Sequence, residues 1–203
     1  MKKEEKTELT KERILAAALK EFGEKGYYGA SLNTICSAGI SKGLLYHNFE
    51  NKDAVYLACM ERCFARLTEY LRSQEIGSDM RRYTDARLHF FQENEYEARM
   101  FFEAILQPPA ALEAHVKEVK KDFDELNREI CSKILETIPL RRGITRDDVM
   151  EHFDLMQRMF NGYFSSPSYN QMGFQDVMKA HELNLTKFLD FLLYGIAERR
   201  ETL

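Results

Sequence analysis

The chain has 203 residues, of which 44% are hydrophobic, and a formal net charge of −4 at pH 7. This much apolar material can form the core of one large or two small domains, and the net charge excludes a polycation as a whole. The charge is uneven, because residues 1–52 carry nine Lys or Arg against seven Asp or Glu, whereas the rest carries 20 against 26. A basic start therefore precedes an acidic remainder.

The four cysteines are Cys36, Cys59, Cys63 and Cys131. The first residues, MKKEEKTELTKER, are charged and lack the apolar stretch of a signal peptide, and no apolar run approaches the length of a membrane span. We therefore expect a cytoplasmic protein with reduced thiols and no membrane partner. Cys59 and Cys63 would share a helix face, but small core side chains are favoured over a metal or redox site because no histidine lies nearby.

The first helix is predicted to begin at Thr10, with residues 1–9 frayed. Gly23 and Gly26 are expected to end it, since glycine is a poor residue for a helix interior. Its apolar stripe, at helical spacing, consists of Ile14, Ala18 and Phe22. This stripe should pack against the elements that follow.

The segment Ser31–Lys52, SLNTICSAGISKGLLYHNFENK, is typical of two short helices joined by a glycine turn. Ser31 and Ser41 are good N-cap residues, because a serine hydroxyl accepts a hydrogen bond from a free amide of the first turn. Gly39 falls where the first helix must stop, and only glycine adopts the left-handed cap without steric cost. The pattern predicts a helix-turn-helix.

A helix of this kind fits the major groove of DNA, and its first residues reach base edges and phosphates. Lys42 supplies charge, Gly43 permits close approach, and the hydroxyl and imidazole groups offer hydrogen bonds to phosphate oxygens. Lys52 lies at the start of the next helix, where the backbone amides also favour an anion. The predicted DNA-binding residues are Ser31, Ser41, Lys42, Gly43, Leu45, Tyr46, His47 and Lys52.

The run Ala38–Phe49, AGISKGLLYHNF, followed by Lys52, resembles the operator-reading motif of the tetracycline-repressor (TetR) family. The resemblance extends back to Thr10 and forward to about Leu57. One departure is a single residue, rather than two, between Cys36 and Ala38. The resemblance implies a homodimer on double-stranded DNA, a small-molecule effector and no cofactor. It also implies an amino-terminal arm that can touch the minor groove through Lys2, Lys3 and Lys6, although a solvated tail is the simpler interpretation.

The remainder is also helical in pattern, with no strand signal and no internal repeat. The predicted helices span residues 50–73, 79–93, 96–106, 110–138, 146–163 and 174–199. We therefore predict an all-α fold of about nine helices. A helix-turn-helix head occupies residues 1–52, and a ligand-binding and dimerisation body occupies residues 53–203.

The resemblance places an effector pocket inside the body, and this region is rich in Phe and Met. The predicted lining residues are Phe64, Phe90, Met100, Phe101, Ile105, Phe123, Met156, Phe160 and Tyr163. Such a stripe indicates an apolar or aromatic effector, although plain core packing produces the same pattern. Possible polar anchors are Arg87, His89, Glu103 and His152.

The last two predicted helices have wide apolar faces, and a short reading helix covers few base pairs, so such heads act in pairs on palindromes. The resemblance implies dimerisation through these two helices. The predicted interface residues are Phe153, Phe160, Leu185, Phe188, Leu189 and Leu192. Burial of these faces within one chain is the alternative.

Motifs for catalysis are missing from the sequence: there is no Gly-x-Ser-x-Gly, His-Glu-x-x-His, Walker or dinucleotide pattern. The five histidines are scattered, and none completes the Glu-x-x-His spacing of a di-iron bundle. The sequence thus favours a non-enzymatic, ligand-responsive repressor without metal. An all-α enzyme and a ligand-free dimeric scaffold remain alternatives.

Overall fold

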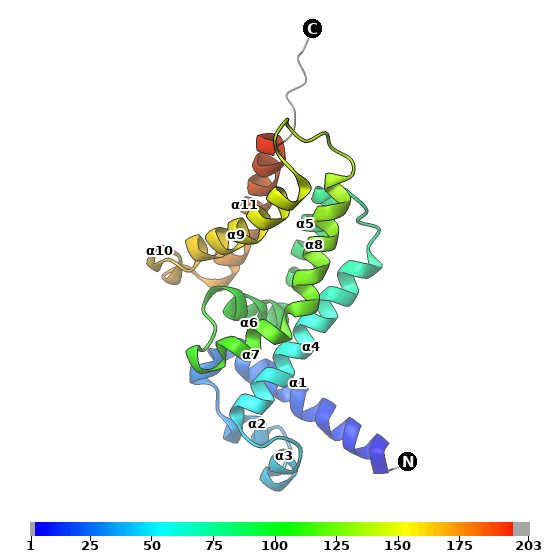
Figure 1. The fold of residues 1–203 in the computed structure, drawn as a ribbon. Coiled ribbons are helices and arrows are strands. Elements are labelled where there is room, and N and C mark those ends of the chain that lie inside the picture. Colours follow the sequence, from blue (N-terminus) through cyan, green and yellow to red (C-terminus); the bar gives the residue numbers. More distant parts are fainter. Residues whose placement is uncertain (1–2, 197–203) are drawn as a thin grey trace. The chain divides into compact units, whose positions relative to one another are not determined.

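The structure is a computed structural model that describes residues 3–196 (Figure 1). Regular structure in this range is helical, with eleven α-helices, nine of at least seven residues, and one 3-10 helix. The all-α fold class is therefore confirmed. The described residues form two compact units: unit 1 runs up to Arg66 and includes Phe91–Lys121, and unit 2 comprises Leu67–Phe90 and the residues from Asp122 onward.

Unit 1 contains α1 (Lys3–Gly29), α2 (Leu32–Ser37), α3 (Lys42–Asn48), the first part of α4 (Lys52–Ser73), α6 (Glu95–Leu106), η1 (Ala110–Leu112) and α7 (Glu113–Val119). Unit 2 contains the end of α4, most of α5 (Met80–Glu93), α8 (Lys121–Leu135), α9 (Arg146–Phe164), α10 (Pro167–Asn170) and α11 (Phe174–Ile196). Because α6 packs against α1, unit 1 is larger than the expected head of residues 1–52.

Helix α1 has the predicted core stripe, since Ile14, Ala18 and Phe22 are all buried. It begins at Lys3 rather than Thr10, so the expected fraying of residues 3–9 is wrong, and Lys2 lies outside the described residues. One ion pair at i,i+3 spacing, between Glu8 and Lys11, lies at the added turns. Near its end the helix is interrupted at Gly26, whose φ of 66° lies in the left-handed region.

Two connections differ from the sequence prediction. The single helix expected over residues 110–138 is instead η1, α7 and α8. The break between α7 and α8 falls at Lys120, whose ψ of 2° departs from the helical value. The loop expected over residues 165–173 contains the short α10, which has Pro167 at its first turn. Proline is accommodated there because the first amides of a helix have no partner within it.

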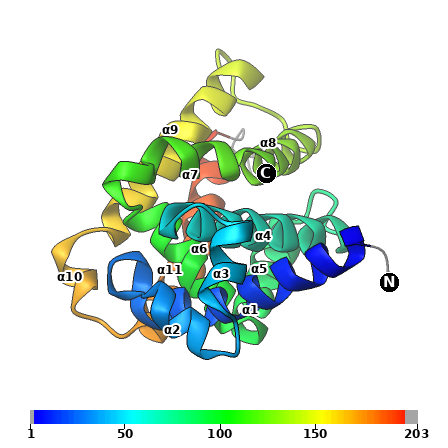
Figure 2. The same cartoon turned by 90° about the horizontal axis from the view of Figure 1, so that it is seen from below.

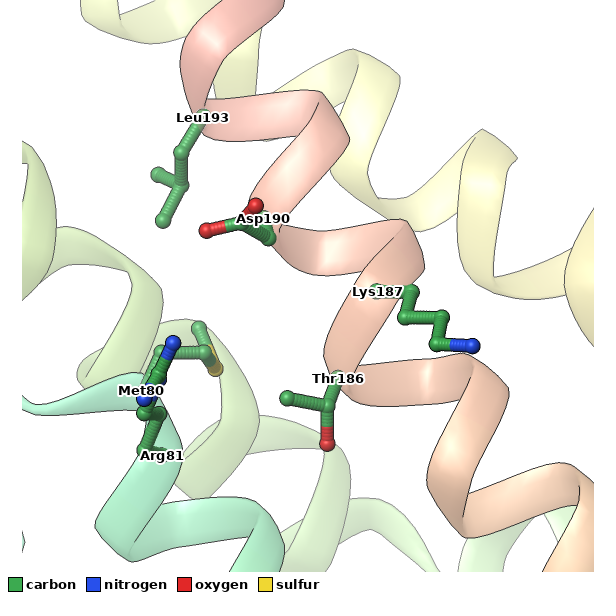
Figure 3. A pocket seen from close by; sticks show the side chains of 6 residues that line it. All are labelled: Met80, Arg81, Thr186, Lys187, Asp190 and Leu193. Atoms are coloured by element: carbon green, nitrogen blue, oxygen red, sulfur yellow. The ribbon is translucent and has the colours of Figure 1, made fainter.

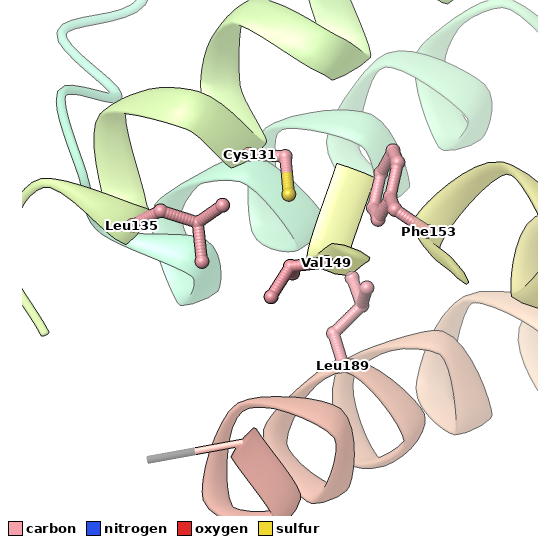
Figure 4. Close-up of a cluster of buried hydrophobic side chains, with 5 residues drawn as sticks. All are labelled: Cys131, Leu135, Val149, Phe153 and Leu189. Carbon is pink, nitrogen blue, oxygen red and sulfur yellow. The ribbon is translucent and has the colours of Figure 1, made fainter. Parts of the chain in front are cut away.

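Unit 2 has a core built from three helices that are distant in sequence. Figure 4 shows the buried side chains of Cys131 and Leu135 from α8, Val149 and Phe153 from α9, and Leu189 from α11 gathered together.

Helix α9 begins with a capping box, in which the Thr145 hydroxyl accepts from the Asp148 amide at 3.1 Å and the Asp148 carboxylate accepts from the Thr145 amide at 2.8 Å.

Candidate nucleic-acid interface

The helix-turn-helix forms as the capping pattern predicts. Helix α2 packs against both α1 and α3 (Figure 2). The Ser31 Oγ accepts a hydrogen bond from the Asn33 amide, and the Ser41 Oγ accepts one from the Leu44 amide, both at 3.2 Å. Between the helices Gly39 has a φ of 80°, so the left-handed cap is present.

The short spacing between Cys36 and Ala38 does not open this turn. The Ile40 amide donates to the Cys36 carbonyl at 3.0 Å, and the Ser37 hydroxyl donates to the Thr34 carbonyl at 2.6 Å. Ile40 and Ile35 are buried on either side of the turn. The turn is therefore closed by its own backbone and anchored to the core.

The outer face of α3 carries the residues predicted to meet DNA. Ser41, Lys42, Gly43 and His47 are exposed, and Tyr46 is 55% exposed. A Cβ added to Gly43 would meet no atom within 4 Å, so the backbone is open on this side. This face is available for contact with a groove, and the contact itself stays a prediction.

One residue of the motif behaves differently from the prediction. Leu45 has 0% exposure, so its side chain supports the head from inside and cannot contact DNA. Its neighbour Leu44 is instead at the surface. Adjacent residues of an α-helix point in directions about 100° apart, so in this short helix Leu45 faces the core while Leu44 lies at the surface.

Lys52 begins α4, whose first turn is capped by Asn51: the Asn51 Oδ1 accepts from the Ala54 amide at 2.9 Å. The Lys52 ammonium lies 4.7 Å from the centre of the Tyr27 ring, a cation–π contact that holds its position. The Tyr27 hydroxyl donates to the Asp53 carboxylate at 2.5 Å. This hydrogen bond, together with burial, raises the pKa of Tyr27 to about 12, so the hydroxyl keeps its proton.

The predicted effector-lining residues fall in both units. In unit 1, Phe64, Met100 and Phe101 are buried and Ile105 is half-buried. The Phe64 and Phe101 rings lie 5.4 Å apart, and Phe91 lies 4.8 Å from Phe101. These rings form a packed aromatic cluster, the plain-core alternative that the sequence left open.

In unit 2, Phe90, Phe123 and Phe160 are buried and Met156 is half-buried. Tyr163 is 61% exposed, so the structure places it on the surface of α9, where it does not line an interior pocket. Helix periodicity alone could not show which of two apolar faces of α9 points inward.

The possible anchor Arg87 is fully engaged inside unit 2. Its Nε and Nη2 groups donate to the two carboxylate oxygens of Glu182 at 2.9 and 2.8 Å, and its Nη1 group donates to the Tyr83 hydroxyl at 3.1 Å. Burial would raise the pKa of Glu182, but the charge and hydrogen bonds of Arg87 outweigh it and lower this pKa to about 2. The pair is therefore ionised at neutral pH, and sequence reasoning had not identified Glu182.

Half of the predicted dimer residues are buried within one chain. Phe153, Phe160 and Leu189 pack inside unit 2, while Leu185, Phe188 and Leu192 are half-buried. The first three fill this core, as in the alternative of burial within one chain, and the dimer interface itself stays a prediction. The outward apolar residues of these two helices are Leu155, Met159, Tyr163, Leu183 and Phe191.

A cavity of about 140 Å³ opens in unit 2 between α5 and α11. Figure 3 shows Asp190, Leu193 and Thr186 reaching from α11 toward Met80 and Arg81 of α5. Its lining includes none of the predicted effector residues. It therefore gives no support to the predicted lining.

Other kinds of site find little support in the described residues. Burial raises the pKa of the Cys59 and Cys63 thiols to about 12, as for core side chains. No three His, Cys, Asp or Glu among residues 3–196 gather as metal ligands. None of the helices in this range combines the length and hydropathy needed to cross a bilayer.

Comparison with known proteins points in one direction. The family model of the bacterial regulatory proteins of the tetR family matches residues 14–59. The chain is similar to IcaR, the negative regulator of the icaADBC biofilm operon of Staphylococcus epidermidis, with 27% identity over 62% of this chain and 68% of IcaR. It is also similar to UidR of Escherichia coli K12, with 45% identity over 30% of this chain and 33% of UidR.

Solved structures extend the likeness to the whole fold. A tetR family transcription regulator from Shewanella sp. PV-4 has a TM-score of 0.61 and 18% identity, covering 94% of this chain and 99% of its own. FadR of Bacillus subtilis in complex with stearoyl-CoA has a TM-score of 0.58 and 14% identity, covering 91% and 98%. These two likenesses show the fold alone. The matched residues 14–59 coincide with α1 to the start of α4 and so with the helix-turn-helix. The amino-terminal part of the chain is therefore a DNA-binding domain of the tetR family, carried on a fold shared with tetR family transcription regulators.

Proposed function

We propose that this regulator is a repressor that binds a palindromic operator as a homodimer and is released by a small apolar or aromatic effector. The observation that carries the DNA-binding part is the outer face of α3, where Lys42, Tyr46 and His47 are exposed together beside the open Gly43. A helix that presents charge and hydrogen-bond donors on an unobstructed face suits the major groove.

Support for repression comes from IcaR, which is a negative regulator. Support for an effector with an apolar part comes from FadR, whose fold is shared and which holds stearoyl-CoA. The interior of both units is rich in aromatic side chains, which suits an apolar ligand once the packing opens.

Support for a homodimer comes from the outward face of α9. Leu155, Met159 and Tyr163 are four residues apart and all exposed, so they form one apolar row. Leu183 and Phe191 of α11 are also exposed, with Phe191 at 79%. A second copy that presents the same rows would cover them through an isologous interface. This face replaces the buried residues of the sequence prediction.

DNA binding is tested by selecting bound fragments from random duplexes and measuring affinity by fluorescence anisotropy at several salt concentrations. A palindromic consensus with a steep salt dependence is expected. Lys42→Ala should lower the slope of log K against log salt by about 0.9 for each phosphate that Lys42 no longer neutralises, so by about 1.8 for a dimer. Lys117→Ala removes the same charge from the exposed surface of α7 and is the matched control. Equal effects of the two variants would refute the assignment.

Release is tested on the preformed complex, with stearoyl-CoA as the first probe. Dissociation by ligands with an apolar part, and not by free coenzyme A, supports the proposal. A complex that no such ligand weakens would contradict the effector-responsive part and leave the DNA-binding part intact.

A further inference from the structure

Glu103 of α6 reaches two residues that are distant in sequence and belong to the head or its first long helix. Its Oε1 accepts the backbone N–H of Tyr27 at 2.8 Å, and its Oε2 accepts the Tyr56 hydroxyl at 2.8 Å. All three residues lie in unit 1. The sequence suggested Glu103 as an effector anchor, whereas the structure commits both of its oxygens to these donors.

The interruption of α1 is what makes the Tyr27 amide available. Gly26, with φ 66° and ψ 176°, leaves the helical conformation directly before it. A Cβ on Gly26 would lie 3.0 Å from the Glu103 Oε1, tighter than ordinary contact. Glycine at this position therefore permits the backbone conformation and leaves room for the carboxylate.

Tyr27 connects this carboxylate to the candidate phosphate contact. Its backbone is bound by Glu103, its ring lies 4.7 Å from the Lys52 ammonium, and its hydroxyl is bound to Asp53. Tyr56 lies one turn after Lys52 on the same helix, and the centres of the Tyr56 and Tyr27 rings lie 4.9 Å apart in an edge-to-face arrangement. Glu103 thus holds the two aromatic residues that surround the first turn of α4.

We propose that Glu103 is a positioning residue for DNA binding, which places the Lys52 ammonium against a DNA phosphate by holding Tyr27 and Tyr56. The inference rests on the proposed DNA-binding function. A half-buried carboxylate that accepts two hydrogen bonds gives the contact a defined geometry, and its removal leaves two donors without a partner. Burial raises the pKa of Glu103, and the two donors together with the nearby Lys52 charge act in the opposite direction.

The sign of the effect separates positioning from simple electrostatics. Glu103 carries a negative charge near a cation that meets DNA, so electrostatics alone predicts tighter DNA binding when this charge is removed. Positioning predicts weaker binding, because Lys52 then loses its fixed orientation. The two accounts therefore differ in direction.

The experiment compares Glu103→Leu with the wild-type chain by anisotropy on the selected operator across a salt series. We expect at least about fivefold weaker binding and a slope reduced by about 0.9 for each phosphate that Lys52 no longer neutralises. Glu103→Gln, which keeps an acceptor for the Tyr27 amide, should recover most of the affinity. The control is Glu97→Leu, because Glu97 is a buried carboxylate on the same helix that pairs with Arg66 instead.

A double-mutant cycle supplies the readout that a general loss of stability would not move. On a Lys52→Ala background, Glu103→Leu should cause no further loss of affinity. If the two losses multiply, if Glu103→Leu binds as tightly as the wild type, or if it matches Glu97→Leu, the inference is overturned while DNA binding stands. A wild-type chain that binds no selected DNA overturns the proposed function as well. Should Glu103→Leu not fold, Tyr56→Phe deletes one of the two hydrogen bonds and should weaken binding about twofold; unchanged affinity would overturn the inference.

Discussion

Removing Glu182 should destabilise the protein more than removing any exposed acidic residue. Arg87 and Glu182 are both buried and form a bidentate pair in unit 2, with N–O distances of 2.9 and 2.8 Å. Glu182→Leu would leave the Arg87 guanidinium charged in a site that excludes water. Breaking a buried pair by removing one partner costs about 3–5 kcal/mol, a large fraction of the roughly 5–15 kcal/mol that stabilises a typical domain.

The measurement is urea unfolding and thermal unfolding, both monitored by circular dichroism. For a chain of this size a loss of 3–5 kcal/mol lowers Tm by about 6–20 °C. The control is Glu129→Leu, since Glu129 forms a similar bidentate pair with Arg72 at 3.0 and 3.2 Å, but on the surface. Exposed pairs contribute at most about 1 kcal/mol.

A second variant separates the cost of an unpaired charge from the loss of packing. Arg87→Met combined with Glu182→Leu removes both charges and should recover most of the stability, because apolar replacements of a buried pair are often neutral or stabilising. The reasoning is refuted if Glu182→Leu costs no more than Glu129→Leu. It is equally refuted if the double variant is as unstable as Glu182→Leu alone.

Three further outcomes follow from the same structure. Gly39→Ala should lower the free energy of unfolding in urea by roughly 1–2 kcal/mol, because the φ of 80° is unfavourable for alanine even though no atom lies within 4 Å of the added methyl group. Gly43→Ala should fold at least as well as the wild type yet bind DNA more weakly. Equal stabilities of the two variants would contradict the claim for Gly39. Burial lowers the pKa of His181 below 6.5, so the folded state favours the neutral ring. The stability from this residue is complete above pH 6.5 and should fall as the pH drops below that value. The difference between the urea midpoints at pH 7.5 and 5.5 should be smaller in His181→Gln than in the wild type, and an identical difference would exclude His181 as the cause. Met159→Glu combined with Phe191→Glu should yield folded monomers in sedimentation, and an intact dimer would place the interface elsewhere.

The local pattern of the sequence determined the head in detail. Ser31 and Ser41 cap their helices and Gly39 turns the chain, because capping and left-handed backbone geometry depend on residues only a few positions apart. The stripe Ile14, Ala18 and Phe22 was equally readable, since a helix with one apolar row has only one way to bury it.

Only the tertiary structure could decide which face of a doubly apolar helix points inward. On α9, Phe153 and Phe160 fill the core while Met159 and Tyr163 stay at the surface, and the helical period allows either choice. The same holds for polar side chains that find partners far along the chain. Glu103 meets Tyr27 and Arg87 meets Glu182 across 76 and 95 residues, and no local rule relates residues at such separations, because the packing of whole helices brings them together.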